Sequence, residues 1–275
     1  MKHLSFLFVF VLLSVFSVAQ VTIKPPNKTI HYEVRNPNGF NSIHNSSSAD
    51  LIITQGDQRS VVVGSSEREL IPHIKTRIKN QTLYVSIDAN YRNVKVIEVK
   101  ITIPELESLT VAGSGDVIFT NVMVEPSMDI LIDGSGDISG VLEVDKLNIT
   151  VNGSGDVDLA GVNNELNLEI SGSGDVFIKD LKLNECIVLN HGSGDVKLVG
   201  KSAYLNANTL GSGDLMGYGL KAVRVQAVLK GSGDMLLFPV NSLNASLEGS
   251  GDIYYKGSPS EVITSEKGSG EIMKR

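Results

Sequence analysis

The sequence predicts an all-β fold, a parallel β-helix-like solenoid of about nine repeats with an irregular β N-terminal cap. Three observations predict it. The tetrapeptide Gly-Ser-Gly-Asp occurs eight times between Gly113 and Asp252, and Gly-Ser-Gly-Glu follows it once, ending at Glu271. Successive acidic residues of these motifs are 18 to 21 positions apart. Apolar residues around each motif alternate with polar ones, which is the period of a β-strand.

One period shows how a repeat is built. Leu147, Ile149 and Val151 precede a tetrapeptide and Val157 and Leu159 follow it, with polar residues between them. Each period therefore contains two short strands, a Gly-Ser-Gly corner at which we expect positive φ angles, and a second bend. The second bend is marked by Gly140, Gly161, Asp180-Leu181 or Gly200. The period is too short for a crossover helix, so stacked coils are favoured, and a run of antiparallel hairpins is the alternative.

Residues 1–19 have the features of a secretory signal peptide. Lys2 precedes an apolar run from Leu4 to Val18, and small residues end the segment at Ala19. Such a segment is removed, and it is too short to span a membrane. We therefore expect export to the periplasm, the outer membrane surface or the medium, with no membrane span after signal removal.

The rest of the chain divides into three parts. Residues 20–45 are polar, contain three prolines and are interpreted as a leader or cap. Residues 46–112 contain strand-like runs without the tetrapeptide, which we interpret as irregular N-terminal β coils. A separate small β domain is the alternative for that part. Residues 113–275 form the repeat solenoid.

Charge and cysteine content exclude several functions. Without the signal peptide, 23 basic residues face 31 acidic ones, a formal charge of 23 minus 31, or −8. An acidic protein without a basic cluster is not expected to bind nucleic acid or anionic lipid. The single cysteine, Cys186, cannot form an internal disulfide, and its place in an apolar column of the repeat predicts a buried thiol.

The acidic residue of each motif precedes an inward-facing position, so these residues should point outward in one column. Neighbouring carboxylates about 4.8 Å apart repel by about 1 kcal/mol in water. Calcium between successive corners would offset this repulsion, and no other cofactor is expected. The candidate calcium ligands are Asp116, Asp137, Asp156, Asp175, Asp195, Asp214, Asp234 and Asp252. Hydrogen bonding from corner N–H groups and serine hydroxyls would also offset it and is the favoured account, with calcium as the alternative.

The residue types do not indicate catalysis, because the carboxylates are periodic and the histidines are scattered. We therefore expect no enzyme and no catalytic residues. The function predicted instead is that of an exported binding or structural protein of the cell envelope. The alternatives are a β-helix enzyme acting on acidic polysaccharide and a structural or envelope-stress component.

Two outward-facing sets are candidate contact surfaces. A polar set, predicted to face a cell-surface or glycan ligand or only solvent, comprises Asn148, Thr150, Asn152, Asn167, Glu169, Ser171, Asn206, Asn208, Asn244 and Ser246. A less polar set comprises Ile118, Phe177, Met216, Leu236, Tyr254 and Met273. Apolar residues in line along a rod favour self-association, so we expect a homo-oligomer through the rod side or the open end.

Several stretches together resemble one known family. They are Ala49 to Asp57, Leu70 to Thr76 and Ile103 to Leu109, followed by the Gly-Ser-Gly-Asp array. From Phe40 onward the chain resembles the putative autotransporter adhesin, head GIN domain family of Bacteroidetes-type bacteria. The resemblance implies a right-handed β-helix-like solenoid, secreted or displayed on the cell envelope, with a role in adhesion. It implies no catalytic residues.

Overall fold

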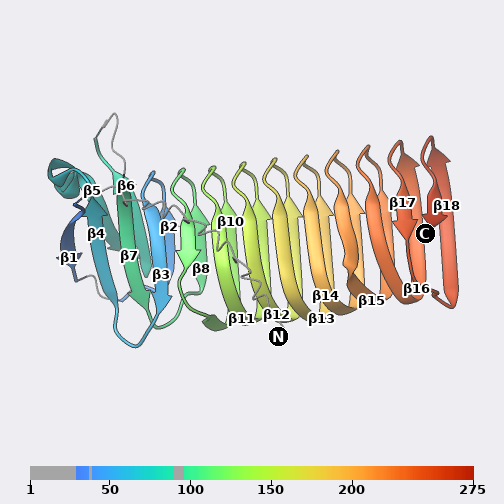
Figure 1. Ribbon diagram of the computed structural model, residues 1–275, viewed down its shortest axis with the longest axis horizontal. Helices are drawn as coiled ribbons and strands as arrows, with labels where there is room; N and C mark the ends of the chain where they lie inside the picture. Colours follow the sequence, from blue (N-terminus) through green and yellow to red (C-terminus); the bar gives the residue numbers. More distant parts are fainter. Residues whose placement is uncertain (1–28, 37–38, 90–95) are drawn as a thin grey trace, which may run out of the picture.

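The computed structural model describes residues 29–36, 39–89 and 96–275 (Figure 1). The chain is nearly all β and winds into a solenoid of about nine turns, which confirms the predicted fold class. The nineteen strands of these residues belong to one continuous hydrogen-bonded sheet. The predicted signal segment, residues 1–19, lies outside the described residues, as do positions 20–28 of the predicted leader.

The repeats form long, bent strands that stack in parallel. From β11 onward, each strand runs along one face of the rod, bends, and returns along the other, and register shifts in the pairings mark the bend. The strands of the repeats are β9 (Val117–Phe119), β10 (Met123–Ile132), β11 (Ile138–Val151), β12 (Val157–Ile170), β13 (Val176–Asn190), β14 (Val196–Thr209), β15 (Leu215–Leu229) and β16 (Met235–Gly249). In Figure 1 the Gly-Ser-Gly corners lie along the upper edge and the bends along the lower edge.

Equal positions of successive coils lie opposite each other and form the core. Leu166 pairs with Leu147 on one side and with Cys186 on the other, and all three are buried. The residue after each Gly-Ser-Gly-Asp corner is buried too, as the alternation predicts, and Ile272 after Glu271 is partly buried: the buried residues are Val117, Ile138, Val157, Val176, Val196, Leu215, Met235 and Ile253. A fully buried aliphatic side chain contributes about 1.5–3 kcal/mol, so each added coil stabilises the one beneath it.

Cys186 behaves as a small apolar side chain. It is completely buried, and this burial raises the pKa of its thiol to about 12. A thiol in that state is not a nucleophile near neutral pH.

The N-terminal coils are not stacked in chain order. β2 (Ser42–Asn45) and β3 (Asp50–Gln55) form one coil; β6 (Thr82–Ile87) and β7 (Ile97–Ile103) form another; β8 (Ser108–Val111) and β9 form a third. β2 pairs with both β6 and β8, and β3 pairs with both β7 and β9, always in parallel. The first coil in the chain therefore lies between the two that follow it.

Antiparallel strands complete this end of the rod. β4 (Ser60–Ser65) pairs with β7, β1 (His31–Arg35) pairs with β4, and β5 (Ile74–Lys79) pairs with β6. The 3₁₀-helix η1 (Arg68–His73) buries Leu70 and Ile71. These elements belong to the same sheet as the repeats, and the predicted boundary at residues 112 and 113 falls in the corner between β8 and β9.

The far end of the rod is built from shorter strands. They are β17 (Ile253–Tyr255), β18 (Glu261–Gly268) and β19 (Ile272–Lys274), which continue the parallel pairing. Every residue of β18 is exposed. No helix in the described ranges is long and apolar enough to cross a membrane.

The expected reason for the corner glycines is wrong. Most glycines with φ between +20° and +160° lie outside the Gly-Ser-Gly corners. Three of them, Gly140, Gly161 and Gly200, lie in the second bends. The corner glycines are needed instead because stacked corners touch. A Cβ on Gly174 would lie 2.0 Å from the carbonyl oxygen of Gly155, and the same contact recurs along the rod. Close backbone approach, rather than positive φ, therefore selects glycine at these corners.

Candidate functional site

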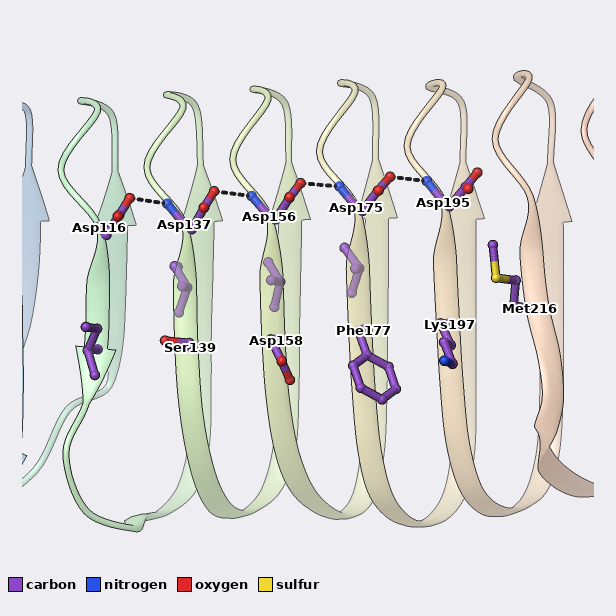
Figure 2. A pocket seen from close by; sticks show the side chains of 14 residues that line it. Asp116, Asp137, Ser139, Asp156, Asp158, Asp175, Phe177, Asp195, Lys197 and Met216 are labelled. Carbon is purple, nitrogen blue, oxygen red and sulfur yellow. Dashed lines mark hydrogen bonds between the residues drawn. The ribbon is translucent and has the colours of Figure 1, made fainter. Parts of the chain in front are cut away.

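The acidic residues of the corners form one hydrogen-bonded column along the rod (Figure 2). Asp116 Oδ1 accepts a hydrogen bond from the backbone N–H of Asp137 at 3.0 Å, and Asp137 Oδ1 accepts one from Asp156 at 2.8 Å. The same bond joins Asp156 to Asp175, Asp175 to Asp195, Asp195 to Asp214, Asp214 to Asp234, Asp234 to Asp252 and Asp252 to Glu271. One oxygen of each aspartate therefore belongs to the scaffold.

The column begins one coil earlier than the motif indicates. Asp50 Oδ1 accepts a hydrogen bond from the N–H of Asp116 at 3.1 Å. Its corner has the sequence Ser-Ser-Ala-Asp in place of Gly-Ser-Gly-Asp, and sequence reasoning missed it. The signal that could have revealed it is a run of small residues before an aspartate. Partial burial, the charge of Asp116 and that of Glu98 raise the pKa of Asp50.

The other end of the column has a different environment. Tyr254 donates its hydroxyl hydrogen to Asp252 Oδ2 at 2.7 Å, and the N–H of Glu271 donates to Oδ1. Both hydrogen bonds lower the pKa of Asp252, the tyrosine having the larger effect. The guanidinium of Arg275 lies 4.1 Å from the centre of the Tyr254 ring.

The column places its carboxylates in line, one to a coil. In the part of the chain that the structure describes, no three carboxylate, imidazole or thiol groups gather into a metal-binding cluster. The corner N–H groups supply the hydrogen bonds considered as the alternative to calcium, and the corner serines are exposed. Calcium binding by the eight aspartates stays a prediction, for which their second oxygens are the available ligands, except that Asp252 Oδ2 already accepts a hydrogen bond from Tyr254.

A groove of about 560 Å³ runs beside the column (Figure 2). We call it the acidic groove. Its rim is formed by Asp116, Asp137, Asp156, Asp175 and Asp195. Its floor is formed by the outward residues two positions after these five aspartates, Ile118, Ser139, Asp158, Phe177 and Lys197, and by Met216 of the next coil. This floor contains half of the apolar set that the sequence singled out, and the short side chains of Ser139 and Asp158 lie between Ile118 and Phe177.

Negative charge dominates the acidic groove. Its lining includes six carboxylates and one ammonium group, that of Lys197. The Lys197 Nζ lies 4.9 Å from the centre of the Phe177 ring, and Lys179 Nζ lies 3.8 Å from Asp158 Oδ1. An occupant of this groove would have to combine apolar surface with positive charge.

The opposite face of the rod carries the predicted polar set, and its amides form short ladders. Asn167 Nδ2 donates to Asn148 Oδ1 at 2.8 Å, and Asn148 Nδ2 donates to Asp129 Oδ1 at 2.6 Å. Asn208 Nδ2 donates to Asn206 Oδ1 within one strand. Each amide has two N–H donors, so every ladder retains donors that face solvent.

Within the described residues, the four histidines lie apart from one another. His73 Nδ1 lies 2.8 Å from Asp88 Oδ1 at the N-terminal end, and His44 packs against Tyr84. His31 is on β1, and His191 is exposed at a corner, as its position in the repeat predicts. The hydrogen bonds from His73 and Lys75 lower the pKa of Asp88.

The chain matches one protein-family model over residues 39–199 and 185–259, with the description putative auto-transporter adhesin, head GIN domain. The comparison with curated proteins finds no relative.

Several solved structures share the fold, among them the following three. A putative adhesin from Parabacteroides distasonis ATCC 8503 has a TM-score of 0.68 at 20% identity, covering 90% of this chain and 98% of its own. A putative adhesin from Parabacteroides merdae ATCC 43184 has a TM-score of 0.65 at 19% identity, and the match covers 90% of this chain and 97% of that protein. A putative lipid binding protein from Parabacteroides distasonis ATCC 8503 has a TM-score of 0.64 at 23% identity, and the match covers 90% of this chain and 98% of that protein. At these identities the likeness is one of fold.

Proposed function

Since this chain belongs to the family described as putative auto-transporter adhesin, head GIN domain, we propose that it is an exported, non-enzymatic, adhesin-like protein. Its ligand in this proposal is a cell-surface glycan, and its binding surface is the polar face of the rod. The amide ladder through Asn148 and Asn167 is the observation that supports this surface. Export rests on the predicted signal segment and the family.

The chemistry of the polar face suits glycan hydroxyls. Hydroxyl groups both donate and accept hydrogen bonds, and so do amides, which present an oxygen and two N–H groups. Asn148 and Asn167 lie on neighbouring coils about 4.8 Å apart, so an extended ligand can contact both amides. Many weak contacts on one rigid surface produce avidity without a deep pocket.

The periodic placement of the carboxylates supports a non-enzymatic role. Glycoside hydrolysis uses one pair of carboxylates at a set separation, with different pKa values. Here the corner aspartates repeat in equivalent positions, and each uses one oxygen to hold the next coil. They act as scaffold groups, so the same residues are poor candidates for a general acid and a nucleophile.

A glycan array with the full chain tests this function. We expect specific glycan binding that is lost in the double variant Asn148→Ala, Asn167→Ala. The matched control is Asn164→Ala, Asn184→Ala, because Asn184 Nδ2 donates to Asn164 Oδ1 in an amide pair away from the polar face. Equal binding by both double variants, or new reducing ends after incubation with polyuronates, would overturn the proposal.

Lipid binding is a second candidate function. The acidic groove favours it, because Ile118, Phe177 and Met216 give its floor apolar surface. One of the similar structures is named a putative lipid binding protein. Flotation of the full chain with neutral vesicles tests this candidate, which predicts co-flotation that Ser139→Leu weakens by filling the groove.

A further inference from the structure

We propose that the polar face carries a subsite for the carboxylate of an acidic sugar residue. The subsite is a group of neighbouring side chains on β14 and β15 (Figure 1), which we call the donor patch: Tyr204, Asn206, Arg224 and Gln226. The patch begins two coils beyond Asn167, the last amide of the ladder described above. This inference rests on the proposed glycan binding and deepens it, because it names the class of glycan.

The strand register brings the donor patch together. In the pairing of β14 with β15, Tyr204 lies opposite Arg224 and Asn206 lies opposite Gln226. The two residues of each strand are two positions apart, so their side chains point to the same face. Arg224 and Gln226 are exposed, and Tyr204 and Asn206 are half-buried. The four side chains therefore start from a rectangle of about 4.8 Å across the strands and about 7 Å along them, the size of a single sugar contact.

Internal hydrogen bonds occupy the amide oxygens of the donor patch. The Tyr204 hydroxyl donates to Gln226 Oε1 at 2.8 Å, and Asn208 Nδ2 donates to Asn206 Oδ1 at 3.1 Å. Both amides are thereby oriented so that their NH₂ groups are left to bind a ligand. In the part of the chain that the structure describes, these NH₂ groups and the guanidinium of Arg224 donate no hydrogen bond. The patch therefore presents donors without acceptors, which is what an oxyanion requires.

The arginine and the tyrosine give the patch its chemical preference. The central carbon of the Arg224 guanidinium lies 5.9 Å from the centre of the Tyr204 ring, which is within the range of a cation–π contact. Among the described residues, no carboxylate forms a salt bridge with Arg224. A guanidinium is a planar fork of N–H donors that matches the two oxygens of a carboxylate. The tyrosine ring beside it supplies apolar surface for the C–H groups of a sugar.

The charge on this part of the polar face favours an anion. The segments 204–209, 224–230 and 242–248 contain three charged residues, and two of them, Lys230 and Glu248, form a salt bridge at 3.2 Å. Arg224 is the third, so the local net charge is positive. The carboxylates in the same row, Glu185 and Glu261, are each two strands from Arg224. That is about 10 Å at the backbone, where physiological salt screens most of their effect.

The negative charge of the whole chain makes the inference selective. An acidic protein does not attract anionic polymers in general, so any preference for a carboxylated glycan has to come from a specific contact. Such a contact requires the guanidinium fork of Arg224 and the amides beside it. The predicted ligand is therefore a uronic acid within a glycan chain or a sialic acid at its end.

Binding of the full chain to polygalacturonate, measured by calorimetry, tests the inference. The comparison ligand is carboxyl-reduced polygalacturonate, in which a hydroxymethyl group replaces each carboxylate. A sialylated oligosaccharide and its desialylated form are a second pair, which distinguishes a terminal acid from one within a chain. The variants are Arg224→Ala, Arg224→Lys and Tyr204→Phe. The matched control is Arg275→Ala, because Arg275 lies 4.1 Å from the centre of the Tyr254 ring in a similar pair on the groove face.

We expect the carboxylated member of at least one pair to bind at least about tenfold more tightly than its neutral counterpart. Arg224→Ala should abolish this preference, and Arg224→Lys should keep only part of it, because an ammonium group has no fork. Tyr204→Phe, which keeps the ring and releases the Gln226 amide, should weaken binding less than Arg224→Ala. Arg275→Ala should match the wild type.

Two kinds of failure are distinguishable. Equal binding of both members of each pair, a preference that Arg224→Ala leaves unchanged, or equally tight binding of dextran sulfate would overturn the inference and leave the proposed function standing. A wild-type chain that binds no glycan would overturn the proposed function and this inference with it. Circular dichroism verifies that the variants are folded.

Discussion

Asn45 and Asn190 close two corners of the solenoid in the same way, although only one of these corners carries the glycine motif. Asn190 Nδ2 donates to the Gly194 carbonyl at 2.8 Å, and Asn190 Oδ1 accepts from the N–H of Gly192 at 3.0 Å. Asn45 Nδ2 donates to the carbonyl of residue 49 at 2.8 Å, and its Oδ1 accepts from the N–H of Ser47 at 3.1 Å. Both asparagines are fully buried.

The Asn190 closure predicts a measurable stability effect. Asn190→Ala leaves the Gly192 N–H and the Gly194 carbonyl without this partner, which should lower the free energy of unfolding by about 1–3 kcal/mol. Denaturant unfolding measures it. Asn208→Ala is the control, because its amide lies on the polar face and should change stability little. Equal stability of the wild type and Asn190→Ala would show that the closure is dispensable.

The stacked corners predict a sharp difference between neighbouring residues. Gly174→Ala would place a Cβ 2.0 Å from the carbonyl oxygen of Gly155, so the corners must move apart. We expect a loss of at least about 2 kcal/mol, as in other overpacked sites. Ser173→Ala, at an exposed position of the same corner, should be nearly neutral. Similar unfolding curves for the two variants would contradict the packing argument.

Thr209 predicts a stabilising substitution. Its hydroxyl is buried without a hydrogen-bond partner, in an inward column in which neighbouring coils carry Asn190 and Leu229. Thr209→Val preserves the shape and removes the polar atom, so it should raise the free energy of unfolding by about 1 kcal/mol. Thr209→Ser, which keeps the hydroxyl and removes the methyl, should instead destabilise. A destabilised valine variant would indicate that the hydroxyl has a role in the fold.

Lowering the pH should reduce the stability contributed by Asp252 at the C-terminal end of the aspartate column. The pKa of Asp252 is lowered in the folded chain, so its contribution to stability is present above its ordinary pKa and is lost as pH falls through the folded value. Tyr254→Phe removes the largest cause of the shift. We expect this variant to unfold more easily than the wild type at neutral pH. The difference should disappear as the pH falls through the lowered pKa of Asp252, because the carboxyl is then protonated in the variant and in the wild type. A difference independent of pH would assign the effect to packing.

The calcium column makes a separate prediction. Calcium bound between the second oxygens of successive aspartates would stabilise only the folded state. Thermal unfolding in the presence of a chelator should then have a lower midpoint than in the presence of calcium. The triple variant Asp137→Asn, Asp156→Asn, Asp175→Asn should reduce that shift. A midpoint that does not respond to the chelator would remove calcium from the column and leave its hydrogen bonds as the explanation.

The repeat was predictable because its signals are local and periodic. Alternation fixed which side of each strand is buried, and residues such as Val157 and Cys186 lie where it placed them. The reason for the glycines was not predictable from one period, because the contact between Gly174 and Gly155 exists only after coils stack. The order of the coils at the N-terminal end could not be predicted either, because it is also set by contacts between coils.

The candidate site was only partly predictable. The motif identified the aspartate column from Asp116 onward, but Asp50 lacks the glycines and was missed. The groove depends on the outward residues two positions later, whose sizes follow no repeat: Ser139 and Asp158 are short where Phe177 is large.

The interleaved coils at the N-terminal end determine how the rod can be assembled. The β2–β3 coil precedes both of its neighbouring coils in the chain, and it pairs with β6–β7 on one side and with β8–β9 on the other. Growth in one direction is then closed by the antiparallel strands, and only the other direction accepts further coils. Length can therefore change during evolution by duplication or loss of whole repeats, without disturbing the seed from which the rod grows.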